Sequence, residues 1–144
     1  MDKKNDLNFL NQFIDAEKRD AAFFGVLNLW PELNDNGIRW VPEDENSKAS
    51  RLRLEKSSIA FGKTVEWILN NLRHSTRINH YRSSYGMKHI AERECGYISN
   101  GLFIAAMIYC DFKAKKTKNG LNCKFTVLES SVRGAERRLN TKLP

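Results

Sequence analysis

The chain has 144 residues, of which 41% are hydrophobic and 28% charged, and its formal net charge is +7. This length and composition predict a single domain over residues 1–144 with enough apolar side chains for a hydrophobic core. No stretch approaches the roughly 20 consecutive apolar residues of a membrane span, and the N-terminus lacks the apolar segment of a secretory signal, so a cytoplasmic location is expected.

The charge is unevenly distributed along the chain. Residues 1–48 hold six Lys or Arg against ten Asp or Glu, a net charge of −4, whereas residues 49–144 hold eighteen against seven, a net charge of +11. An acidic front end followed by a basic region is typical of an electrostatic footprint for nucleic acid. The alternative is an ordinary solvated surface with some asymmetry of sign.

The first predicted element is a helix over residues 6–30. Asp6 is a plausible N-cap, and the helix is expected to end before Pro31. Its apolar residues recur at helical spacing, at Leu7, Leu10, Phe13 and Ile14.

Residues 31–48 contain two prolines, an Asn-Gly pair and an acidic run, and they predict a loop or a short extended arm. Trp30 and Trp40 flank this segment, and we expect them to pin it to the core because each can bury a large apolar area. Residues 1–48 are therefore interpreted as an acidic N-terminal helix plus loop.

A second helix is predicted over residues 49–74, with Ser50 as its cap and Gly62 as a possible interruption. It would place Arg73 and His74 in its last turn, where the helix dipole favours cations. Its apolar stripe consists of Leu52, Ile59, Val65, Ile68, Leu69 and Leu72.

Residues 67–91 are the most informative stretch, because they contain no Asp or Glu but carry four cations, all three histidines and two tyrosines. An anionic ligand is the natural partner for such a segment. Residues 73–88 are expected to be an exposed, irregular connector between two helices.

Two short helices are predicted next. Ser83 or Ser84 can cap a helix that reaches about Cys95 and ends at Gly96, and Ser99 or Asn100 can cap a helix over residues 102–110. This arrangement superficially resembles a DNA-reading helix-turn-helix. However, the second helix is apolar around its whole circumference, which predicts a buried central helix without donors for base edges.

An antiparallel hairpin is predicted at about residues 111–129, around a two-residue turn at Asn119 and Gly120. Folding about this turn pairs residues 116 with 123, 114 with 125 and 112 with 127. Phe112, Ala114, Cys123, Phe125 and Val127 would share the inner face.

The outer face of the hairpin would carry Lys113, Lys115, Thr117, Asn122, Lys124 and Thr126. Such a lysine ribbon suits a phosphate backbone, and it equally suits a solubilising face that protects an edge strand. The tail, residues 130–144, predicts a short basic helix or a flexible end.

Catalytic and metal chemistry find little support. His89 and Glu92 lie three positions apart on a predicted helix, but a metal site needs further ligands, and no nucleophile or cofactor motif is present. The three cysteines, Cys95, Cys110 and Cys123, have no CxxC pair, so we expect reduced, mostly buried thiols. No metal or cofactor is expected. Metal-free acid-base nuclease chemistry with His80 or His89 remains as a third hypothesis.

Residues 82–89, RSSYGMKH, are followed by Glu92 and by GYISNGLFIAAM at residues 96–107. This pattern resembles small uncharacterised proteins of bacteriophages, prophages and plasmids, and the resemblance covers residues 73–127. It implies an accessory protein of a mobile genetic element in the bacterial cytoplasm. Two functions are common in that setting: binding the element's nucleic acid, and blocking a host nucleoprotein complex, such as a CRISPR effector, by protein contact.

The sequence thus predicts an α+β, mostly helical single domain, with a basic region over residues 49–144. We expect a non-enzymatic protein that binds DNA or RNA with little sequence preference. The alternative is an inhibitor of a bacterial defence complex that docks through the basic surface or through the acidic loop 31–48. The residues expected to contact nucleic acid are Arg73, Arg77, His80, Tyr81, Arg82, Tyr85, Lys88, Lys113, Lys115 and Lys124, with Tyr81 and Tyr85 stacking on bases.

Overall fold

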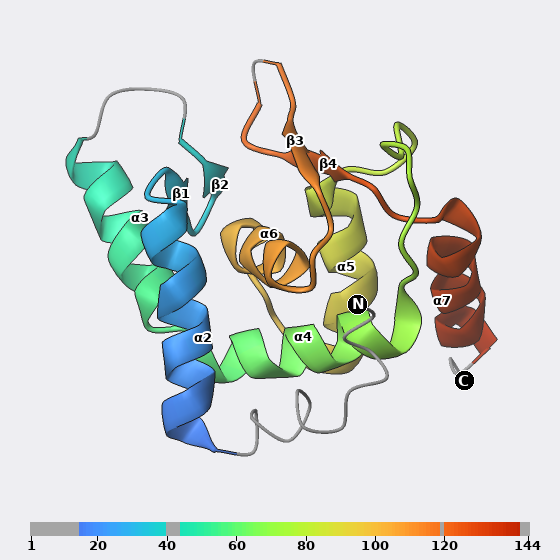
Figure 1. The fold of residues 1–144 in the computed structure, drawn as a ribbon, viewed down its shortest axis with the longest axis horizontal. Helices are drawn as coiled ribbons and strands as arrows, with labels where there is room; N and C mark the ends of the chain where they lie inside the picture. Colours follow the sequence, from blue (N-terminus) through green and yellow to red (C-terminus); the bar gives the residue numbers. More distant parts are fainter. Residues whose placement is uncertain (1–14, 40–43, 119, 142–144) are drawn as a thin grey trace.

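The computed structural model describes residues 15–39, 44–118 and 120–141. Within these residues the chain forms six helices and two antiparallel pairs of short strands, so the predicted α+β, mostly helical class is confirmed (Figure 1). The helices are α2 (Ala16–Leu29), α3 (Glu45–Glu55), α4 (Ser58–Asn71), α5 (Ser84–Cys95), α6 (Asn100–Tyr109) and α7 (Glu129–Thr141). The strands are β1 (Leu33–Asn34), β2 (Gly37–Ile38), β3 (Ala114–Lys116) and β4 (Cys123–Phe125).

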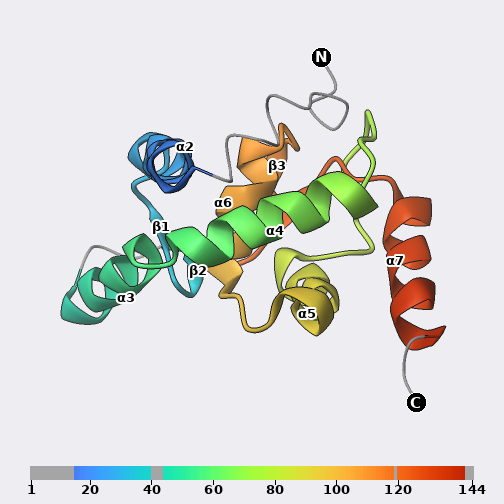
Figure 2. The same ribbon diagram turned by 90° about the horizontal axis from the view of Figure 1, so that it is seen from below.

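Helix α6 is the centre of the fold. Residues 100–107 are all buried, and α6 contacts α2, α4, α5 and the strands β1, β2 and β3. Figures 1 and 2 show α4 crossing beneath α6, with α2 and α3 at one end of the molecule and α7 at the other. The expectation of a buried central helix, rather than a recognition helix, is therefore confirmed.

The predicted caps of α5 and α6 are also present. Ser83 Oγ accepts a hydrogen bond from Gly86 N at 3.1 Å, and Ser99 Oγ accepts one from Leu102 N at 3.1 Å. Gly96 ends α5 with a φ of 79°, a backbone conformation that favours glycine. Each cap satisfies a helix-end N–H that would otherwise lack a partner.

The helix predicted over residues 49–74 is two helices, α3 and α4, separated at Lys56 and Ser57. Gly62 lies buried inside α4 and does not interrupt it, and Ser50 lies buried inside α3, where Asp44 provides the cap. Leu52 and Ile59, expected on the core-facing stripe, are exposed. Helix α4 ends at Asn71, so Arg73 and His74 lie beyond its last turn.

Segment 31–48 differs from the expected loop. Strands β1 and β2 pair Leu33 with Ile38, and both side chains are fully buried. Trp30 packs half-buried against the core, as expected, whereas Trp40 lies outside the described residues. Leu33 and Ile38 therefore fix residues 33–38 of this segment to the core.

Residues 6–14, with the predicted cap and apolar stripe of the N-terminal helix, lie outside the described residues. The described part, α2, is capped by Asp15 and ends before Pro31, as predicted. Arg51 ties its end to β1: the guanidinium donates to the carbonyl oxygens of Leu27 at 2.9 Å and Leu33 at 2.8 Å.

The C-terminal hairpin has the predicted register, because Ala114 pairs with Phe125 and Lys116 with Cys123. The inner face is buried as expected, with Ala114 half-buried. Two details differ. Val127 opposes His74 instead of Phe112, and Thr126, expected on the outer face, is buried. The predicted turn lies partly outside the described residues, at position 119.

The tail forms α7, an amphipathic helix that packs on α4 and α5 through Val132, Ala135 and Leu139. It is therefore part of the core. All three cysteines are free, and Cys110 and Cys123 are buried as expected. Among the described helices, none is both long enough and apolar enough to cross a membrane.

Candidate nucleic-acid interface

The candidate site is built on residues 72–83, which link α4 to α5 and which we call the connector. The connector runs beside β4 and extends its main-chain pairing: Asn79 N donates to Phe125 O at 2.8 Å, and Ser75 N donates to Thr126 O at 3.0 Å. This contact explains why Thr126 is buried. The irregular segment predicted over residues 73–88 is shorter than expected, because residues 84–88 belong to α5. The part before α5 is fixed to the hairpin by backbone hydrogen bonds, each worth about 1 kcal/mol net.

The start of the connector has its own contacts. The His74 ring stacks on Phe112, with 3.9 Å between ring centroids and 13° between planes, and the Arg73 carbonyl accepts from Leu128 N at 2.8 Å. His74 also forms the bridge with Val127, which takes the place of the predicted pairing with Phe112. His74 therefore has a packing role.

A side-chain contact brings the hairpin lysines to the connector. Lys124 Nζ donates to the His80 carbonyl oxygen at 2.9 Å. Lys115 lies directly opposite Lys124 across the hairpin, and opposed residues point to the same face. Lys113, two positions before Lys115, points the same way. We define the loop-hairpin surface by six residues that this arrangement gathers: Arg77, His80, Tyr81, Lys113, Lys115 and Lys124.

The electrostatics of the loop-hairpin surface follow from its two segments, since neither residues 67–91 nor residues 112–128 contain an Asp or Glu. Arg77, Lys113 and Lys115 are exposed, and none forms an ion pair within the described part of the chain. Lys115 and Lys124 are like charges directly opposite one another, which is unfavourable unless an anion lies between them. The surface is therefore suited to anions.

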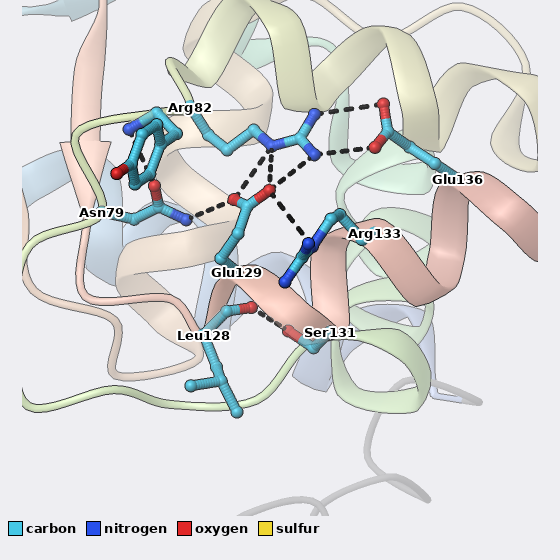
Figure 3. Close-up of polar contacts among 8 residues, drawn as sticks. Asn79, Arg82, Leu128, Glu129, Ser131, Arg133 and Glu136 are labelled. Atoms are coloured by element: carbon cyan, nitrogen blue, oxygen red, sulfur yellow. Dashed lines mark hydrogen bonds and ion pairs between the residues drawn. The ribbon is translucent and has the colours of Figure 1, made fainter.

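Arg82 does not belong to this surface, which corrects the expectation that it lies exposed on the connector. Its guanidinium donates to Glu129 Oε2 at 2.8 Å and to Glu136 Oε1 at 2.7 Å, and its side chain is only 20% exposed (Figure 3). Asn79 Nδ2 and Arg133 also contact Glu129. These bonds raise the pKa of Arg82 and lower that of Glu129. Arg82 connects the start of α5 to α7.

Lys88 was also expected to be an exposed, phosphate-binding side chain, and the structure contradicts this. It is 6% exposed, and its ammonium group forms an ion pair with Glu92 one helical turn away. The same Nζ lies 5.1 Å from the ring centroid of Tyr85 and 5.3 Å from that of Tyr97. The spacing of Lys88 and Glu92, four residues apart, is a sequence signal that could have indicated this pair.

Tyr85 is exposed, but it lies on α5 and packs edge-on against His89, with 4.5 Å between ring centroids. No contact in the described structure joins it to the loop-hairpin surface. Arg73 is exposed at the start of the connector, and its guanidinium donates to the Leu72 carbonyl. Of the ten predicted site residues, six thus belong to the loop-hairpin surface, Arg73 lies beside the start of α7, and Arg82, Tyr85 and Lys88 lie elsewhere.

Catalytic geometry is weak around the histidines. His89 Nδ1 lies 3.9 Å from Glu92 Oε2, but Glu92 is already paired with Lys88. His80 is exposed on the connector, and its backbone carbonyl accepts a hydrogen bond from Lys124 Nζ. Within residues 15–39, 44–118 and 120–141, no group of three or more His, Cys, Asp or Glu could hold a metal ion.

Sequence reasoning missed two residues at the site. Glu129 anchors both Asn79 and Arg82, and Leu128 is a 43% exposed apolar residue next to the connector. The sequence does indicate that these two carboxylates act together, because Glu129 and Glu136 are seven residues apart and therefore lie on one face of a helix. Their partner Arg82 lies far away along the chain, and no local pattern identifies it.

Replacing Glu129 with Gln is expected to flatten the dependence of stability on acid pH. The Arg82 hydrogen bonds hold the pKa of Glu129 below its ordinary value, so this carboxylate stabilises the fold above its unfolded-state pKa. That stabilisation is lost as the pH falls through the folded-state pKa. Urea unfolding midpoints measured from neutral to acid pH should show lower stability at pH 7 and a shallower acid slope.

The matched control is Glu66→Gln, at an exposed position on α4. It removes one carboxylate of the same kind without touching Arg82. An unchanged acid slope in Glu129→Gln would contradict the assignment.

Comparisons of the chain with protein-family models, with curated protein sequences and with solved structures found no match.

Proposed function

We propose that this protein binds nucleic acid through the loop-hairpin surface, mainly by contacts to the phosphate backbone. The observation that carries the proposal is the docking of two acid-free segments, residues 67–91 and 112–128, by backbone bonds and by the contact of Lys124 with His80. Each cation placed on a phosphate releases counterions, so such a surface gives affinity with little sequence preference.

The setting of this activity belongs to the same proposal. The resemblance of residues 73–127 to proteins of phages, prophages and plasmids supports an accessory role in the bacterial cytoplasm, with the nucleic acid of the mobile element as a natural ligand. No enzymatic step is part of the proposal.

The experiment is a fluorescence-anisotropy titration of DNA and RNA oligonucleotides at two salt concentrations. The triple variant Arg77→Ala, Lys113→Ala, Lys115→Ala should bind at least ~10-fold more weakly at low salt, and its plot of log affinity against log salt should be shallower by about two to three. Affinity should fall alike on all sequences, because phosphate contacts do not read bases.

A charge-matched control comes from the opposite end of the fold. Lys18, Lys56 and Lys63 are exposed on or beside α2, α3 and α4, and changing all three to Ala removes the same net charge. That variant should keep the salt slope of the unmodified protein. Equal losses in both variants would assign binding to net charge alone, and no binding at low salt would overturn the proposal in favour of a protein target.

A further inference from the structure

A groove of about 460 Å³ lies between the connector and the start of α7. Its walls include the apolar side chains of Ile78, Val127 and Leu128, with Arg77 and Tyr81 among the other residues that line it. Its volume falls within the range of about 300–1,000 Å³ that is common for small-ligand sites. The groove therefore offers an apolar cleft that shares Arg77, His80 and Tyr81 with the loop-hairpin surface.

Tyr81 is the outstanding feature of this groove, because 88% of its surface is exposed although it is a large aromatic residue. Its position is fixed by the backbone: Tyr81 N donates to Asn79 Oδ1 at 2.9 Å, and Asn79 itself is held by Phe125 O and Glu129. A solvent-exposed ring on an anchored backbone is accessible for stacking, and the backbone needs no ordering when a flat ligand binds.

Glu129 is the one acidic residue that lines the groove, and its charge is compensated, so it does not repel a phosphate. Arg82 donates to both of its carboxylate oxygens, Asn79 donates to Oε1, and Arg133 Nε lies 3.9 Å from Oε2. The two carboxylates of Glu129 and Glu136 are thus balanced by the two guanidinium groups of Arg82 and Arg133 (Figure 3). Arg77 lines the groove and forms no ion pair within the described residues, and Lys124 contacts the carbonyl oxygen of His80, another lining residue.

We propose that this groove binds an unpaired base of single-stranded nucleic acid, stacked on Tyr81, while Arg77 and the hairpin lysines hold the neighbouring phosphates. An apolar cleft bordered by cations complements a nucleotide, which has an apolar base face and an anionic phosphate. A duplex hides its base faces within the stack, so only a single strand can satisfy both parts of the surface. The inference depends on the proposed function and specifies its ligand.

The test compares three oligonucleotides of equal phosphate number in the same anisotropy assay: a homothymidine strand, a strand whose sugars carry no bases, and a duplex. The homothymidine strand should bind most tightly. Tyr81→Ala should weaken its binding roughly tenfold or more and leave binding of the abasic strand unchanged. Tyr81→Phe should retain binding, because the ring and not the hydroxyl group stacks.

The outcomes separate this inference from the proposed function. Equal affinity for the homothymidine and abasic strands, with no effect of Tyr81→Ala, would overturn base binding and leave phosphate binding intact. Failure of all three oligonucleotides to bind at low salt would overturn both. Because Tyr81 is exposed and its anchoring bond is made by the backbone N–H, the variants should fold normally, which circular dichroism can verify.

Discussion

Gly101→Ala is expected to lower the free energy of unfolding by about 3 kcal/mol, since overpacking at a rigid site costs about 1–3 kcal/mol and sometimes more. A Cβ at this position would lie 1.7 Å from Asn34 O and 2.8 Å from Asn34 C. These are backbone atoms of β1, and Gly101 N also donates to Asp35 O at 3.2 Å. Neither α6 nor β1 can move away without losing contacts at the centre of the fold.

The measurement is urea unfolding at neutral pH, with the thermal midpoint as a second readout. A loss of about 3 kcal/mol should lower the midpoint by about 6–12 °C for a domain of this size. Gly134→Ala is the matched control, because Gly134 lies exposed on α7 with no heavy atom within 4 Å of the added Cβ. That variant should be more stable by about 0.5–1 kcal/mol, as alanine is the better helix former. Equal stabilities of the two variants would contradict the close approach of β1 to α6.

The sequence predicted the elements whose signals are local. The caps Ser83 and Ser99 act on N–H groups within three residues, and Gly96 ends α5 through its own backbone conformation. The register of the C-terminal hairpin follows from strict alternation of apolar and polar residues on either side of a short turn. In each case the physical cause lies within a few residues of its effect.

Features that depend on distant contacts were not predictable in this way. The prediction joined α3 and α4 into one helix and placed Leu52 and Ile59 on its core-facing stripe, but both side chains are exposed and the helix breaks at Lys56 and Ser57. The strands β1 and β2 were not predicted because they lie in a mostly polar segment. Their buried side chains are Leu33 and Ile38. Their partners belong to other elements of the fold.

The candidate site shows the same division. The acid-free composition of residues 67–91 correctly marked a segment with exposed cations, but composition could not separate Arg77, which is exposed, from Arg82, which is paired. What separates them is α7: Glu129 lies 47 residues after Arg82 in the chain. A basic stretch therefore predicts the sign of a surface, while the fold decides which of its cations remain available to a ligand.

Arg82→Ala is the prediction that tests this division of roles. The guanidinium makes hydrogen bonds to both Glu129 and Glu136, and bonds to charged groups contribute about 1.5–3 kcal/mol each when partly buried. Because Glu136 is 38% exposed, its contribution is reduced by solvent screening. We expect the free energy of unfolding to fall by about 2–3 kcal/mol, measured by urea unfolding at pH 7.

The control is Arg133→Ala, which removes the same charge from a second arginine that contacts Glu129. Arg133 is 63% exposed and its Nε lies 3.9 Å from Glu129 Oε2, so the loss should be below about 0.5 kcal/mol. Arg82→Lys should recover only part of the stability, because an ammonium group cannot bridge two carboxylates as the planar guanidinium does.

The decisive test compares the stability and the oligonucleotide affinity of Arg82→Ala with those of Arg77→Ala. At a temperature where Arg82→Ala is still folded, it should bind oligonucleotides nearly as well as the unmodified protein, whereas Arg77→Ala should bind more weakly with unchanged stability. The two arginines lie five residues apart on the same connector, so composition and sequence position are closely matched between them. If Arg82→Ala lost affinity without losing stability, the ion pairs with α7 would be incidental and Arg82 would belong to the binding surface. The opposite behaviour of the two variants is what the geometry of the connector requires.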